Sequence, residues 1–173
     1  MKTAKQFYNK SFLGILFFAS FFFLFSNNSA QQTKLIDNFL GEWKGTGKLF
    51  VNDAEFFMKW EKTLGDKFIQ LDFKNSFKLQ NGKEITMTAK AFYKHESENN
   101  FKGTWFDSRG MILPLKSNID QNAFITFWGT PETEQGKTIY KFFEDNTIQT
   151  EDYVLKNGEW KQFGTADYKK TEN

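Results

Sequence analysis

The feature that most constrains the fold of this chain is an alternation of apolar and polar residues, interrupted by a turn signal roughly every ten residues. The clearest stretches are residues 69–74, 85–94 and 101–105, in which the apolar side chains fall on one face. Asn-Gly, the strongest two-residue hairpin signal, occurs at positions 81–82 and 157–158. This pattern predicts consecutive antiparallel hairpins.

About ten strands with short connections are expected, which is typical of an antiparallel barrel or sandwich. Glycines inside strands supply the bends that close a barrel, and four Gly-Thr pairs in the expected strands begin at Gly45, Gly103, Gly129 and Gly164. The polar face carries charged residues along its length, which excludes a lipid-facing barrel surface. We therefore expect an all-β fold, an up-and-down antiparallel β-barrel of about ten strands, with a short helix over residues 33–40.

The first 30 residues have the order of a signal peptide. Three lysines precede an uncharged run over residues 12–25, which is shorter than the ~20 residues of a membrane-spanning helix. A small, polar segment then leads to Ala30. We expect cleavage after Ala30, export to the periplasm or the medium, and one mature domain, residues 31–173, with no stable membrane insertion. An uncleaved anchor is the alternative.

Composition excludes several classes of function. The chain has no Cys and one His, so thiolate metal sites, thiol nucleophiles and multi-histidine metal sites are excluded. The 23 basic and 21 acidic residues balance, so no nucleic-acid partner is expected. Aromatic residues make up 19% of the chain, and their rings favour strands around an apolar interior.

Three short motifs carry a resemblance to known families. Residues 41–47 read Gly-x-Trp-x-Gly-x-Gly, which resembles the first strand of lipocalins, of other calycins and of nitrobindin-type haem-binding barrels. Residues 60–69 and 101–110 resemble hairpins of exported bacterial lipocalin-like domains of unknown function. The resemblance implies a closed lipocalin-like barrel around a cavity.

The same resemblance concerns one end of the barrel and a cofactor. We expect Gly41 and Trp43 to close that end because Trp43 follows the helix that would cover it, and the alternative for Trp43 is to line a ligand cavity. The resemblance to lipocalins implies Lys169 or Lys170 over the Trp43 ring. The haem-binding relatives carry their axial His in the last part of the barrel, where this chain has none. The single His, His95, lies mid-chain beside acidic residues and is interpreted as an exposed loop residue. We therefore predict no cofactor and keep haem as an alternative.

Five aromatic side chains are candidates for lining a cavity, because their expected strands place them on the inner face. Small residues on that face, such as Ala91 and Gly103, either leave a cavity against these rings or interdigitate with them and fill the interior. The sequence leaves both alternatives open. The candidate ligand-binding residues are Trp60, Trp105, Tyr140, Phe142 and Trp160.

The sequence shows no catalytic constellation. Asp107 and Arg109 flank a turn and are interpreted as turn chemistry. Carboxylates such as Glu151 and Asp152 are interpreted as solvated surface. We therefore expect an exported, non-enzymatic, lipocalin-like barrel that binds a small apolar or aromatic molecule. The alternatives are a nitrobindin-like haem protein with redox or isomerase chemistry, and a structural or interaction protein whose barrel is filled.

Overall fold

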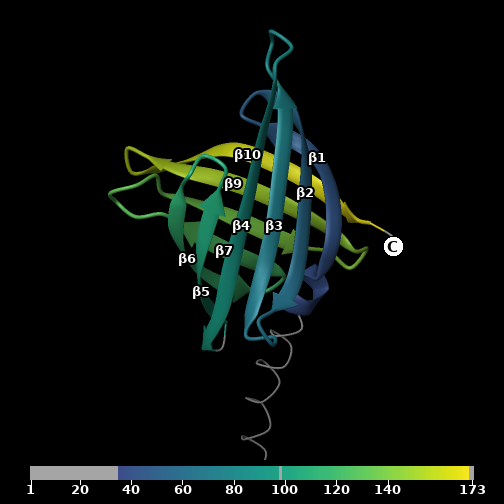
Figure 1. The fold of residues 1–173 in the computed structure, drawn as a ribbon, viewed down its shortest axis with the longest axis vertical. Coiled ribbons are helices and arrows are strands. Elements are labelled where there is room, and N and C mark those ends of the chain that lie inside the picture. Colours follow the sequence, from purple (N-terminus) through teal and green to yellow (C-terminus); the bar gives the residue numbers. More distant parts are fainter. Residues whose placement is uncertain (1–34, 98, 172–173) are drawn as a thin grey trace, which may run out of the picture.

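Residues 35–97 and 99–171, which the computed structural model describes, form ten antiparallel strands and one short helix, residues 35–39. Each strand pairs with its neighbours in sequence, and β10 pairs with β1, so the sheet closes on itself as a barrel (Figure 1). The predicted fold class is confirmed. The strands are β1 (Gly41–Leu49), β2 (Asn52–Thr63), β3 (Phe68–Lys78), β4 (Glu84–Ser97), β5 (Asn100–Asp107), β6 (Ile112–Asp120), β7 (Ala123–Trp128), β8 (Gly136–Phe142), β9 (Thr147–Lys156) and β10 (Glu159–Lys170).

The predicted leader, residues 1–30, lies outside the described residues. The helix expected over residues 33–40 is present at residues 35–39, and Gly41 with its positive φ of 115° follows it as the first residue of β1. Within the described part of the chain, no helix is both long and apolar enough to cross a bilayer.

The predicted alternation places apolar side chains inside the barrel. Leu71 and Ala91 are paired across β3 and β4, and both are fully buried. Large residues therefore lie beside small ones, which lets the wall curve without overcrowding. Gly103 of β5 lets two strands approach closely, because a Cβ there would lie 2.3 Å from the carbonyl oxygen of Phe92 on β4. A larger residue at this position would force the two strands apart.

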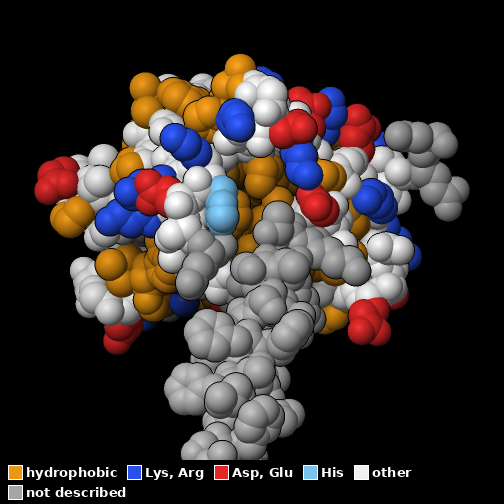
Figure 2. All heavy atoms as spheres, turned by 90° about the horizontal axis from the view of Figure 1, so that it is seen from below, with side chains coloured by type: hydrophobic (Ala, Val, Ile, Leu, Met, Phe, Trp, Pro, Cys, Tyr) orange, Lys and Arg blue, Asp and Glu red, His pale blue; other side chains and the backbone are white. Residues whose placement is uncertain are grey.

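The helix closes one end of the barrel (Figure 1). Its Phe39 is fully buried, and the ring lies 5.8 Å from Trp60 and 6.0 Å from Phe142. Trp43 is also fully buried, its indole Nε1 donates to the carbonyl of Phe39 at 2.7 Å, and Lys170 Nζ lies 5.2 Å from the ring centre. Seen from this end, hydrophobic side chains lie in the middle and also at the rim, and charged side chains lie between these areas (Figure 2). Trp43 thus lies where a barrel-closing residue is expected.

Candidate functional site

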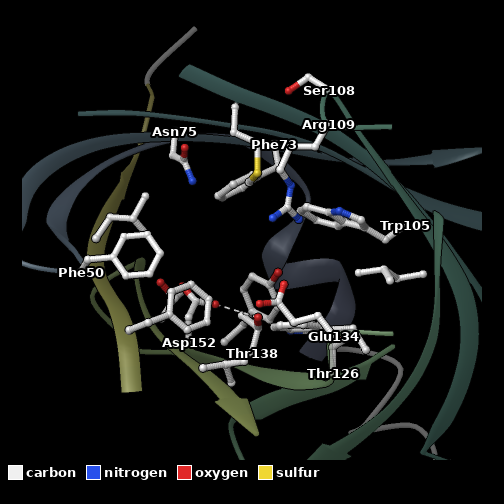
Figure 3. A pocket seen from close by; sticks show the side chains of 18 of the residues that line it. Phe50, Phe73, Asn75, Trp105, Ser108, Arg109, Thr126, Glu134, Thr138 and Asp152 are labelled. Atoms are coloured by element: carbon white, nitrogen blue, oxygen red, sulfur yellow. Dashed lines mark hydrogen bonds between the residues drawn. The ribbon is translucent and has the colours of Figure 1, made fainter. Parts of the chain in front are cut away.

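A cavity of about 350 Å³ enters the barrel from the end opposite the helix (Figure 3). The turns that join β1 to β2, β5 to β6 and β7 to β8 supply its mouth, through Phe50, Arg109 and Glu134. The sequence left open whether the side chains leave a cavity or fill the interior, and in this half of the barrel they leave a cavity. The apolar and aromatic residues of the cavity wall are Leu49, Phe73, Phe77, Ile85, Met87, Trp105, Leu113, Leu115, Trp128, Val154 and Phe163.

Two of the five predicted cavity residues line this space and two do not reach it. Trp105 of β5 forms part of the wall, and Tyr140 of β8 lines the cavity on the side of the closed end. Trp60 and Phe142 also point inward, but they pack around Phe39 at the closed end. Alternation assigned these side chains to the inner face correctly, but it carries no information about height along the barrel axis.

Trp160 lies on the outer surface, which corrects the prediction that it points inward. The residue is 40% exposed, and Lys137 Nζ lies 4.9 Å from the ring centre. The cause is a β-bulge in β10 between Gln162 and Gly164. Counted back from the buried Ala166 without a bulge, alternation assigns Trp160 to the inner face, and the extra residue reverses that phase.

Asp152 is an acidic residue inside the cavity, which corrects its interpretation as solvated surface. Its Oδ1 accepts a hydrogen bond of 2.7 Å from the hydroxyl of Thr138 on β8 (Figure 3). The carboxyl keeps some accessible surface because it faces the hollow of the barrel. Burial raises the pKa of Asp152 to about 6, and the hydrogen bond from Thr138 offsets this only in part.

Hydroxyl groups cover the deeper part of the cavity around Asp152. Tyr93 is hydrogen-bonded to Thr126 and to Tyr140, and Tyr168 is hydrogen-bonded to Thr150. Burial raises the pKa of each of these tyrosines above its ordinary value, so all three remain neutral at physiological pH. The cavity is therefore polar at its floor and apolar along its walls.

Asn75 of β3 adds a polar group to the opposite wall. Its side chain lines the cavity, and the residue is only 4% exposed. Figure 3 shows its amide pointing into the space, across from Asp152. Within the part of the chain that the structure describes, the amide has no hydrogen-bond partner. A buried amide of this kind is stabilised when a ligand or a water molecule bonds to it.

Arg109 at the mouth is held by the turn that was predicted from its sequence. Its Nε and Nη2 donate to Oδ2 of Asp107 at 3.1 and 2.7 Å, and its backbone N–H donates to Oδ1 at 2.8 Å. The indole of Trp105 also donates to Oδ2, at 3.1 Å. Burial alone would raise the pKa of Asp107, but the hydrogen bonds from Arg109 and Trp105 outweigh it and the pKa is lowered. The turn thus fixes both the indole in the wall and the guanidinium at the mouth.

His95 does not belong to this cavity. It is exposed near the end of β4, close to the β4–β5 connection, whereas the cavity mouth includes the β5–β6 turn at the other end of the barrel. Its ring lies 5.0 Å from Phe101. The residues present therefore do not fit a histidine-ligated haem in the cavity. In residues 35–97 and 99–171, no three His, Cys, Asp or Glu side chains are grouped so that they could hold a metal ion.

Sequence reasoning missed Asp152 and Asn75, although a signal for both exists. Asp152 has the same alternation phase as Ile148 and Val154, both of which are buried. Asn75 likewise continues the inner face that Leu71 begins. The adjacent Glu151 makes Asp152 look like part of an exposed acidic pair, and only its phase within β9 indicates otherwise.

A model of a family described as a protein of unknown function, DUF1579, matches residues 28–170 of the chain. No curated protein is detectably similar to it in sequence. Among solved structures, Rv2717c from M. tuberculosis is similar in fold, with a TM-score of 0.59, 9% identity, and coverage of 82% of this chain and 98% of that one. The S-type phycobiliprotein lyase CPES from Guillardia theta is similar at a TM-score of 0.58 and 9% identity, covering 82% and 93% of the two chains. At such identities these likenesses show the fold alone.

Proposed function

The chain belongs to the DUF1579 family of proteins of unknown function, and from its cavity we propose that the barrel binds a small, largely apolar or aromatic molecule. The observation that carries this proposal is the open cavity of about 350 Å³ with its walls of rings and aliphatic side chains. Small-molecule sites typically have volumes of about 300–1,000 Å³, apolar walls and a few placed polar groups. Asp152, Asn75 and the tyrosine hydroxyls are such polar groups.

Binding fits these residues better than catalysis does. The three cavity tyrosines are held in their neutral form by burial, and Asp152 is hydrogen-bonded to a hydroxyl rather than to a base. The mouth of the cavity lies between the turns at the end of the barrel opposite the helix, which offers a ligand a route of entry. We also propose, from the leader-like order of residues 1–30, that the protein works outside the cytoplasm.

A neutral fluorescent probe, N-phenyl-naphthylamine, tests the proposal. We expect its emission to rise on mixing with the protein, with an affinity of about micromolar order. Val154→Phe should weaken probe binding about tenfold or more, because Val154 lines the cavity and a ring there takes up its volume. Leu155→Phe is the matched control, because the next residue along β9 points to the outer face.

Two results would overturn binding in the barrel. One is the absence of any probe response at concentrations up to about millimolar. The other is an equal effect of Val154→Phe and Leu155→Phe, which would place the probe on the outer surface. The surface-acting alternative would then be favoured.

A further inference from the structure

Resting on the proposed function, we propose that the ligand is an organic cation: a small amine with an aromatic or aliphatic body, whose ammonium group pairs with Asp152 inside the barrel. Three observations support this assignment: the carboxyl of Asp152 lacks a counter-ion, neither of the two cations that line the cavity supplies one, since Arg109 is paired with Asp107 and Lys156 is exposed at the end of β9, and the walls contain aromatic rings.

Asp152 faces the cavity without a positive partner. Its Oδ1 accepts from Thr138, and its neighbours on the inner face are Thr150, Tyr140 and Tyr168. Within residues 35–97 and 99–171 no Lys or Arg forms an ion pair with it. An ionised carboxyl removed from bulk water is unfavourable unless it is paired. A ligand ammonium supplies the missing charge and donates hydrogen bonds to the carboxylate.

The groups at the mouth do not supply that charge. Arg109 is bound to Asp107 through two of its nitrogens, and Glu134 adds a second negative charge nearby. Lys156 is exposed at the end of β9. The titratable side chains that line the cavity besides Asp152 are Tyr93, Arg109, Glu134, Tyr140, Lys156 and Tyr168.

The walls favour a cation as well as an apolar body. Trp105, Trp128 and Phe73 line the space, and the faces of such rings attract organic cations. The indole of Trp128 packs directly on Gly136, where a Cβ would come within 1.9 Å of the ring. The apolar part of the amine would therefore lie against rings while its ammonium group reaches Asp152.

Asn75 adds a second requirement. The residue is 4% exposed, and its amide points into the cavity from the opposite wall and has no partner among the described residues. It can bond a hydroxyl, ether or carbonyl group of a ligand that extends across the space. An amine that bonds to both Asp152 and Asn75 therefore carries one neutral polar group at a distance from its nitrogen.

A charge series tests the proposal with three compounds of nearly equal shape: phenylbutylamine, phenylbutanol and phenylbutyrate. Each is used to displace N-phenyl-naphthylamine from the full chain. We expect the amine to compete about tenfold or more better than the alcohol, and the carboxylate to compete worst. The neutral alcohol serves as the reference for the apolar contacts alone.

Two variants locate the effect. Asp152→Asn should abolish the advantage of the amine over the alcohol, with both affinities measured relative to the affinity of that same variant for the neutral probe. Asp167→Asn is the matched control, because Asp167 lies on the exposed outer face of β10, where Gln149 donates to it, and it should leave the series unchanged. For wild type, the preference for the amine should also fall between about pH 7.5 and pH 5, as the Asp152 carboxyl is protonated while the amine stays charged.

The outcomes separate this inference from the proposed function. If the neutral probe binds in the barrel but amine and alcohol compete equally, the cation assignment fails and the binding function stands. If phenylbutyrate competes best, the charge that matters is Arg109 and the assignment also fails. If no probe binds, both proposals fail. The pH series on wild type keeps the test decisive even where Asp152→Asn alters folding.

Discussion

Asp152→Asn should stabilise the folded barrel near neutral pH, although it removes a charged group from a hydrogen bond. Burial raises the pKa of Asp152 from its ordinary value of 3.8 to about 6. Because the pKa of this acid is higher in the folded state, folding is most favourable below about pH 4, and that advantage is lost as the pH rises through about 6. At pH 7.5 the ionised carboxyl therefore costs about 3 kcal/mol of stability.

The size of this effect follows from comparing the change in the free energy of unfolding caused by Asp152→Asn at two pH values. Asn cannot ionise, and its side-chain oxygen can still accept the hydrogen bond from Thr138. The stabilisation by Asp152→Asn should therefore be about 2 kcal/mol larger at pH 7.5 than at pH 4, where the folded state holds Asp152 mostly protonated. With a urea m-value of about 2 kcal/mol/M, this is a difference of about 1 M in the shift of the unfolding midpoint.

Urea unfolding followed by tryptophan fluorescence at both pH values measures this difference, with Asp167→Asn as the surface control. We expect the control to show no such difference, because Asp167 is exposed on the outside of β10. An Asp152→Asn effect that is the same at both pH values would refute the reasoning. It would mean that water in the cavity solvates the carboxylate well enough to cancel the effect of burial.

Three further predictions concern other parts of the molecule. Trp105→Ala should weaken binding of the neutral probe about tenfold or more because it removes part of the cavity wall, whereas Lys102→Ala on the outer face should not, as fluorescence titration would show. Trp43→Ala should lower the free energy of unfolding by about 3–5 kcal/mol through the void it leaves at the closed end, and a loss below about 1 kcal/mol would contradict that role. N-terminal sequencing of exported protein should begin near Gln31, and recovery of an intact Met1 would count against cleavage.

The sequence by itself determines the class of fold and the two faces of each strand. The alternation over residues 69–74 and 85–94 is sufficient because successive side chains of a strand point to opposite sides, so a buried face must be apolar. The Asn-Gly pair at residues 157–158 marks the turn between β9 and β10, where both residues have positive φ. These are local signals, and they do not depend on what the strands pack against.

Only the tertiary structure decides which inward residues line a cavity. Trp60, Trp105 and Phe142 all lie on inner faces, but only Trp105 borders the open space. Height along the barrel depends on the register between strands and on the helix that fills one end, and both are set by contacts distant in sequence. Whether large and small side chains interdigitate or leave a hollow depends on the same packing.

Two positions show how non-local geometry overrides a local pattern. A bulge between Gln162 and Gly164 reverses the phase of β10 and turns Trp160 outward. Gly164 marks an irregularity in this strand, but the sequence does not show whether that glycine is a bend or an extra residue. Asp152 follows the inward phase of β9 despite its polarity, and Thr138, which lies opposite it on β8, donates a hydrogen bond to its carboxyl. From its charge alone, Asp152 is expected to be exposed to solvent. In the structure it instead faces the interior that all ten strands of the barrel enclose.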